Sequence, residues 1–376
     1  MRTLVCSLSL LAFAAGTTHA QGTLSTQGFG YPPGQIGART FSMGGGPAEV
    51  DQLSLLNPAS QANWGAPGLY LEYQPDYRSI SSANGTDHTM TARFPQASGA
   101  LTIGPRAVLG ISTSTLLDRT WETQRTGIQH YATGDSAQFT EQFKSSGAID
   151  DIQLALAFEV VRKLWIGVGG HLFTGTNDLS IQRTSSDTTF GLFQQSTSLT
   201  YSGSGVSGGL LWAPGAGLML GVSGRVGGTI TSYRNDTSLT TAKVPRRLGA
   251  GVSFQGLPGV VVALRGDWEG WSSLGSLGQP GLGVTDGWDV GGGVEVRGPG
   301  LFGSAMPLRA GVRERTLPFL ADGTRIRERT YSIGTGIQIL GGRSRIDLGL
   351  ARASRTQVAG IAEHSTIFTA GFMVRP

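Results

Sequence analysis

The chain has 376 residues, of which 59 are glycine and 14% are charged, with a formal net charge of +4. Typical proteins contain about 7% glycine and about 25% charged residues, so this composition is unusual in both respects. Repeated alternation of Leu, Val and Ile excludes a disordered chain. The only cysteine, Cys6, lies in the leader described next, so the rest of the chain has no thiol for disulfides, thiolate metal sites or nucleophilic catalysis.

The first twenty residues have the pattern of a secretory signal peptide. A basic residue precedes an apolar run over 4–15, and Thr18-His19-Ala20 forms a small-x-small cleavage site. The apolar run is too short to span a bilayer comfortably, which argues against a membrane anchor. We therefore expect residues 1–20 to be removed and the mature chain to begin at Gln21.

Residues 21–66 follow without regular alternation. Asp51 could cap a short helix over 52–56, and Pro58 would end that helix at Asn57, because proline disfavours helical backbone in the residue before it. The segment is compact and rich in glycine. We expect it to form a unit distinct from the rest of the chain.

From residue 67 to the C-terminus the sequence alternates with a period of two. Ile152, Leu154 and Leu156 share one face while Gln153 and Ala155 share the other, as successive side chains of a β-strand do. Connections that are alternately short and long in sequence separate these segments. The predicted strands are residues 68–78, 87–101, 106–120, 152–160, 164–174, 198–212, 218–229, 247–254, 260–268, 287–297, 307–315, 329–340, 344–353 and 363–374.

The strand pattern favours a transmembrane β-barrel. Single-chain bacterial barrels have an even number of strands, with short turns at one end and longer loops at the other. Leu218, Leu220 and Val222 share one face, opposite Ser223, which suits an apolar exterior and a polar lumen. A soluble β-sandwich also alternates, but the scarcity of charge favours the membrane protein. We predict an all-β fold, a transmembrane antiparallel β-barrel of about fourteen strands over residues 67–376.

The ends of the predicted strands carry two further groups of side chains. Trp165 and Trp212 each lie beside a predicted short turn, where barrels have an interfacial aromatic girdle. A group of arginines, interrupted by Glu314 and Glu328, surrounds a predicted long loop. Mixed charge favours a solvated loop over a nucleic-acid patch, and contact with anionic lipopolysaccharide is an alternative. These arginines are Arg313, Arg315, Arg325, Arg327 and Arg329.

Matches to catalytic motifs lack the structural context that those motifs need. Residues 203–208 fit a dinucleotide-binding fingerprint, and residues 205–209, centred on Ser207, fit a nucleophile elbow. Both motifs require a strand–turn–helix, whereas here they lie within one predicted strand. The histidines lack metal-ligand spacing and are interpreted as isolated: His88, His130, His171 and His364. We predict no enzymatic activity, no cofactor and no metal site.

The lumen of a fourteen-stranded barrel is wide enough to hold a folded segment. Residues 21–66 precede the first strand and could fill it as a hatch. The simpler alternative is a tail in the periplasm. We expect the hatch, with Asn57 buried and hydrogen-bonded.

The chain resembles the outer-membrane long-chain fatty acid transporter family (FadL/TodX type). That family opens with Gly-Ala-Arg, Met-Gly-Gly-Ala, Asp and Asn-Pro-Ala, which the run from Gly37 to Ala59 matches, with Gly46-Pro47 where Ala is usual. Later segments resemble its hairpins and late strands in the same order. These are residues 208–214, 218–222, 245–254, 262–272, 309–312 and 333–336.

The resemblance implies passive uptake of hydrophobic molecules, such as long-chain fatty acids or aromatic hydrocarbons, across the outer membrane. It implies an apolar pocket, a hatch that shifts when ligand binds, and exit through a gap in the barrel wall. The partners expected are a hydrophobic small-molecule ligand, outer-membrane lipids, lipopolysaccharide and the barrel assembly machinery, with no nucleic acid. Alternatives are a barrel component of a protein-secretion system, a non-specific structural barrel and a β-sheet adhesin. The implied gating residues are Met43, Gly44, Gly45, Asn57, Pro58 and Ala59.

Overall fold

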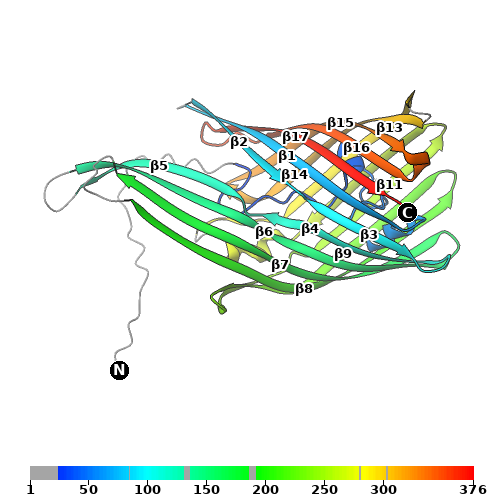
Figure 1. Ribbon diagram of the computed structural model, residues 1–376, viewed down its shortest axis with the longest axis horizontal. Helices are drawn as coiled ribbons and strands as arrows, with labels where there is room; N and C mark the ends of the chain where they lie inside the picture. The colour runs from blue at the N-terminus through cyan, green and yellow to red at the C-terminus, as the bar shows by residue number, and fades with distance from the viewer. Residues whose placement is uncertain (1–23, 84, 131–135, 186–191, 279–280, 302–303) are drawn as a thin grey trace.

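The computed structural model describes residues 24–83, 85–130, 136–185, 192–278, 281–301 and 304–376. Their strands form one antiparallel sheet that is closed on itself (Figure 1). The predicted signal peptide lies outside the described residues. The first nine strand segments are β1 (Gly68–Ser82), β2 (Gly85–Arg93), β3 (Gln96–Thr102), β4 (Ala107–Asp118), β5 (Trp121–His130), β6 (Ser136–Val161), β7 (Leu164–Ser185), β8 (Phe193–Gly215) and β9 (Leu218–Arg234). The others are β10 (Thr237–Lys243), β11 (Arg247–Leu257), β12 (Val260–Glu269), β13 (Gly287–Leu301), β14 (Ser304–Ala321), β15 (Thr324–Ile339), β16 (Ser344–Arg355) and β17 (Ala362–Val374).

Six of these segments combine in pairs into single barrel strands. β2 and β3 both pair with β1, β4 and β5 both pair with β6, and β10 and β11 both pair with β9. The seventeen described segments therefore make fourteen strands, and the pairing of β17 with β1 closes the barrel. The predicted fold class is confirmed, and the fourteen predicted strands coincide in order with those observed.

Several connections predicted to be long are instead tight turns between longer strands. Asn235-Asp236 joins β9 to β10 and Asp322-Gly323 joins β14 to β15, and all four residues have positive φ. Two-residue hairpins of the preferred twist need this backbone. The arginine group assigned to a long loop thus lies on the β14–β15 hairpin. The prediction was wrong because the strands continue past the exposed apolar outer surface with polar residues, where no apolar face marks them.

The strands β6, β7 and β8 contain 26, 22 and 23 residues, whereas about 9–11 residues span a membrane. With β5 they extend beyond the rest of the barrel at the end opposite the C-terminus (Figure 1). The described helices include none with the length and apolar character needed to cross a membrane.

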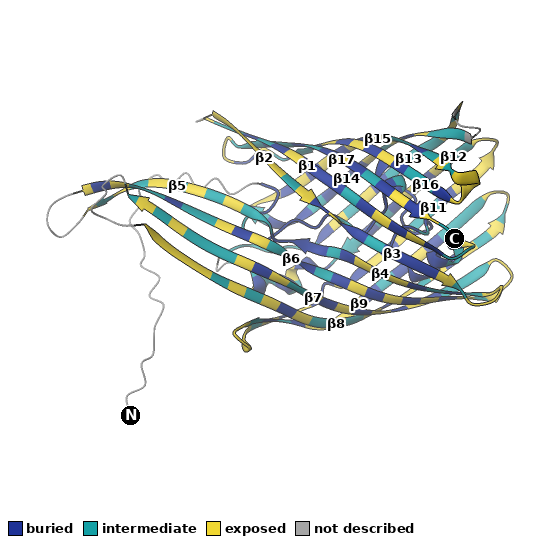
Figure 2. Cartoon of the chain, viewed as in Figure 1, coloured by how far each residue is buried: buried dark blue, intermediate teal, exposed yellow. Residues whose placement is uncertain are grey.

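Side chains along the strands alternate between exposed and buried faces (Figure 2). On β9, Val222 is 47% exposed and Ser223 is 2% exposed, so the predicted outer and inner faces of this strand are correct. Trp212 lies on the outside as predicted. Trp165 does not, because it is half-buried against the cluster that contains Ala59 and Leu211.

Short helices occur where the N-terminal segment contacts the barrel: α1 (Ala38–Ser42) and the 3₁₀ helix η1 (Pro58–Trp64). The helix predicted over 52–56 is absent. Asn57 begins η1 instead of ending a helix, because its side chain accepts a hydrogen bond from the Ala59 N–H at 3.0 Å. Proline suits the first helical position, where an N–H would have no intrahelical partner. Asp51 accepts from the Leu53 N–H at 2.9 Å and closes a turn.

Candidate functional site

The described N-terminal segment, from Leu24 to Trp64, lies inside the barrel and is mostly buried (Figure 2). Helix α1 packs against β15, β16 and β17, while η1 packs against β6, β7 and β8. Two different parts of the wall therefore hold the middle and the end of the segment. We call residues 24–66 the hatch from here on.

The residues singled out for gating sit where the hatch backbone meets the wall. Met43 is fully buried, and the Gly44 N–H donates to Ser332 Oγ at 3.1 Å. Gly44 and Gly45 have positive φ, which favours glycine. Asn57 is buried and donates to the carbonyls of Glu49 and Leu210 at 2.7 and 3.1 Å, as expected from the sequence.

The inner wall is lined by glycines opposite the hatch. A side chain at Gly311 would overlap the backbone of Met43 and Gly44, and one at Gly209 would overlap Asn57. The hatch therefore packs directly on strand backbone. Other wall glycines in this position are Gly167, Gly221, Gly293 and Gly334.

Buried ion pairs also hold the hatch. Glu49 pairs with Arg247 and accepts a hydrogen bond from Ser223 at 2.7 Å. Burial alone would raise the pKa of Glu49, but the Arg247 guanidinium outweighs it and the pKa is lowered. Arg39 pairs with Glu295 and Asp51 at 3.0 and 3.1 Å.

The side chain of Tyr31 is surrounded by arginines. Its hydroxyl donates to Glu328 at 3.1 Å, and its backbone forms an isolated bridge with Asp118 of β4. Burial raises the pKa of this phenol. Four guanidinium groups lie 4.7–5.6 Å from the ring centroid, those of Arg78, Arg93, Arg315 and Arg355.

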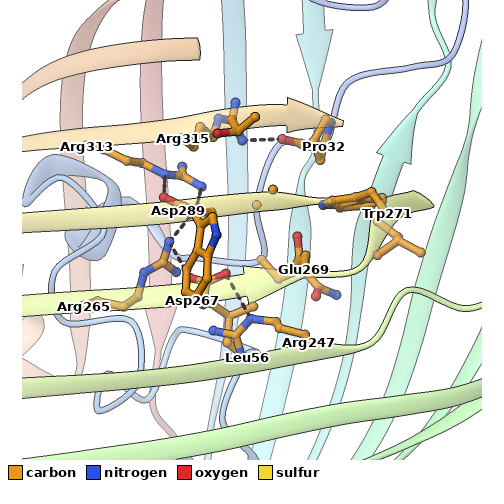
Figure 3. Close-up of a pocket in the computed structure, with 16 residues that line it drawn as sticks. Pro32, Leu56, Arg247, Arg265, Asp267, Glu269, Trp271, Asp289, Arg313 and Arg315 are labelled. Carbon is orange, nitrogen blue, oxygen red and sulfur yellow. Dashed lines mark hydrogen bonds and ion pairs between the residues drawn. The ribbon is translucent and has the colours of Figure 1, made fainter. Parts of the chain in front are cut away.

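A belt of charged side chains lies along the inner face of the adjacent strands β11 to β14, beside the hatch (Figure 3). Arg313 donates to Asp289 at 2.8 Å, and Arg315 donates to the Pro32 carbonyl at 2.6 Å. The cavity among these residues has a volume of about 40 Å³, room for water but not for a ligand.

Beyond the charged belt, toward the end opposite the C-terminus, the lumen is apolar. Buried side chains from β4, β6 to β10, β14, β15, the hatch and the β12–β13 connection pack into one cluster, which we call the apolar chamber. Barrel lumens are ordinarily polar, so an apolar cluster in the lumen is unusual and indicates a functional role. Its large members include Leu24, Phe29, Tyr31, Leu117, Ile149, Phe173, Tyr201, Ile230, Trp271, Leu274, Leu317 and Phe319.

Two openings adjoin the apolar chamber. The first is a mouth pocket of about 430 Å³, whose lining includes the chamber residues Leu24, Ala321 and Val358 with Trp121 and Phe143. The second lies in the wall. Among the described residues no ladder joins β2 to β5, and a cavity of about 730 Å³ occupies that gap. Tyr201 lines this wall gap and belongs to the chamber.

Arg119 lies in the connection from β4 to β5, between Asp118 and Thr120, which line the wall gap. It donates to the Tyr201 hydroxyl at 3.0 Å and to the Leu277 carbonyl at 3.2 Å, while its Nε has no partner. Every other buried arginine among the described residues forms an ion pair, but Arg119 forms none. An unpaired buried charge is costly. Sequence reasoning missed this residue because nothing in the pattern separates it from the other arginines.

His171 is not isolated, contrary to the sequence prediction. Its Nδ1 lies 2.8 Å from Asp151 Oδ1 and its Nε2 lies 2.8 Å from Ser207 Oγ. The three residues come from β6, β7 and β8, so only strand register could have revealed them. Gln35 of the hatch donates to Asp151 at 2.9 Å, which makes the group a further hatch contact. The group lacks the strand–turn–helix of a nucleophile elbow, since Ser207 lies within β8.

No metal-binding group of His, Cys, Asp and Glu occurs among the described residues. No family model and no curated protein matches the chain. Solved structures do match it. A FadL homologue of Pseudomonas aeruginosa is 12% identical with a TM-score of 0.62, covering 92% of this chain and 99% of its own.

Two toluene transporters are similar to the same extent. TbuX of Ralstonia pickettii is 16% identical with a TM-score of 0.59, covering 90% of this chain and 98% of its own. TodX of Pseudomonas putida is 13% identical with a TM-score of 0.58, covering 91% and 98%. The fold implied by the sequence resemblance is thus confirmed: the chain is a closed fourteen-stranded antiparallel barrel and shares its fold with the FadL homologue and the toluene transporters.

Proposed function

We propose that the protein is an outer-membrane channel for passive uptake of hydrophobic molecules. The apolar chamber carries this proposal, because this cluster of apolar side chains borders both the mouth pocket and the wall gap, whereas barrel lumens are ordinarily polar. A hydrophobic solute crosses the polar lipopolysaccharide layer poorly, and an apolar conduit lowers that barrier. The similar structures described as toluene transporters and a FadL homologue support it.

In this proposal the ligand enters at the mouth pocket, rests in the apolar chamber and leaves sideways through the wall gap into the membrane. Leu24, Phe29 and Tyr31 belong to both the hatch and the chamber, so a ligand that displaces them also acts on the hatch. Gating would then occur where the hatch meets the wall, at Met43, Gly44, Gly45, Asn57, Pro58 and Ala59.

Arg119 favours a ligand with an anionic head group. An amphiphilic carboxylate could place its tail in the chamber and its head on the unpaired guanidinium, whereas a neutral hydrocarbon would leave that charge unpaired. Long-chain fatty acids are therefore the preferred substrates over aromatic hydrocarbons.

Filling the wall gap tests the route. Ala148→Trp places an indole among the residues that line the gap. We expect uptake of a fluorescent fatty acid into proteoliposomes to fall at least tenfold while binding to detergent-solubilised protein changes little. Val222→Trp adds the same side chain to the outer face away from the gap and should leave uptake unchanged. Equal uptake by all three proteins would refute the lateral route.

A further inference from the structure

The turns at the two ends of the barrel carry opposite charges. At the end that holds the C-terminus, the turns contain Arg106, Arg162, Lys163 and Arg343, and their described residues include no acid. At the other end, the described turn residues that are charged are Asp236, Asp286 and Asp322. The exposed cations Arg234, Lys243, Arg325 and Arg327 of that end lie within strands and not in turns. We call the first four residues the basic turns.

The basic turns are free to meet an external partner. The Arg106 side chain is 78% exposed, and its Nε lies 4.0 Å from Glu159, the longest ion pair of the described chain. Arg162, Lys163 and Arg343 are exposed and form no ion pair among the described residues. By contrast, the exposed Arg329 at the other half of the barrel pairs with Glu314 at 2.7 Å.

An apolar band lies directly beside the basic turns on the outer surface. Cations at the edge of such a band sit at the depth of lipid head groups, with their stems along the apolar surface. The exposed members of the band nearest these turns are Ile103, Val161, Trp212, Leu257, Leu340 and Phe372.

We propose that the basic turns form a binding surface for anionic phospholipid head groups of the adjoining leaflet. The chemistry recognised is a phosphodiester that carries net negative charge beside an apolar chain, as in phosphatidylglycerol. Guanidinium groups donate two hydrogen bonds to such phosphates, and the neighbouring band contacts the acyl chains. The proposal rests on the membrane location proposed above, but not on transport.

Native mass spectrometry of the full-length protein in equimolar phosphatidylglycerol and phosphatidylcholine tests this surface. The native protein should retain about ten times more bound phosphatidylglycerol than phosphatidylcholine. The variant Arg106→Gln/Arg162→Gln/Lys163→Gln/Arg343→Gln should lose the preference. The matched control Arg234→Gln/Lys243→Gln/Arg325→Gln/Arg327→Gln removes the same charge from exposed cations at the other end and should keep it.

Further variants separate a lipid site from a general charge effect. Arg106→Lys/Arg162→Lys/Arg343→Lys keeps the charge and should retain most of the preference, and heat-modifiable gel mobility shows whether each variant is folded. Loss of preference in the control would mean that net charge alone is responsible and would overturn the proposal. A native protein with no preference would overturn it too, and would point to an acidic polypeptide as partner. Either result leaves the uptake assay unaffected.

Discussion

Glu49 shows how a single buried carboxylate can hold a movable segment. It lies in the hatch, yet its partners Arg247 and Ser223 belong to the wall. Because those partners stabilise the charged form, its pKa lies below the usual value of about 4.5. The carboxylate therefore contributes to hatch attachment fully above about pH 4.5, and the contribution is lost as the pH falls through the lowered pKa.

Replacing Glu49 should loosen the hatch at neutral pH. Glu49→Gln removes a charged hydrogen bond worth about 1.5–3 kcal/mol, so amide exchange of residues 37–60 should become faster at pH 7. In the native protein the same acceleration should appear only when the pH drops well below 4.5. Glu314→Gln, which removes an exposed pair, should change neither rate. Slow exchange in Glu49→Gln at pH 7 would contradict the anchoring role.

A change at Arg119 tests whether the protein prefers a ligand with an anionic head group. Arg119→Met keeps much of the side-chain length and removes the charge, so binding of a fluorescent fatty acid should weaken by about tenfold or more. Binding of a neutral fatty alcohol of the same chain length should stay the same or improve, because no charge is left unpaired. Fluorescence titration of both ligands measures this. If both lose affinity equally, Arg119 supports the fold and does not select the head group.

At the scale of elements, successive residues of the strand β9 face either the outer surface of the barrel or the lumen. A Lys at Val222, which is 47% exposed on the outer face of β9, should cost roughly 2–4 kcal/mol in barrel stability. A Lys at Ser223 meets Glu49 and Arg247 in a filled lumen, so it should displace the hatch while the barrel persists. Urea unfolding and hatch proteolysis distinguish the two effects. Comparable loss of barrel stability in both variants would mean that the strand phase is wrong.

The strands could be predicted from the sequence along the part of the barrel where their outward side chains are apolar. Residues such as Leu220 and Val222 must be apolar there, so their period of two is visible. Beyond the bilayer that constraint disappears, which is why β6 to β8 are longer than predicted and tight turns replace predicted loops. The predicted strand ends at residue 120, so β5, which lies beyond the wall gap, was not predicted, because its residues are mostly polar and show no apolar face.

The site was predicted less completely than the fold. Asn57 was correctly expected to be buried, because its neighbours resemble a known hatch motif. The group of Asp151, His171 and Ser207, by contrast, depends on ladder register across β6, β7 and β8. Register follows from pairing of whole strands and not from local spacing.

At the scale of the whole molecule, barrel and hatch are separable units. The barrel ladder closes through β1 and β17 without the hatch. Deleting residues 37–60 should therefore leave a barrel that still shifts on gels only after boiling, because closure leaves few free strand edges. Liposome swelling should show that the lumen now admits small polar solutes, and fatty acid binding should fall. Unchanged permeability would mean that the segment does not seal the lumen.

The wall glycines that face the hatch have a consequence for the evolution of the barrel sequence. At Gly209 and Gly311 the inner surface of the wall is complementary in shape to the hatch, because a side chain at either position would overlap hatch atoms. Part of the high glycine content of this chain is thus explained by the close packing of the wall on the hatch. A barrel that had lost its plug would be free to acquire larger side chains at these positions, so the residues found there would distinguish a filled interior from an empty one.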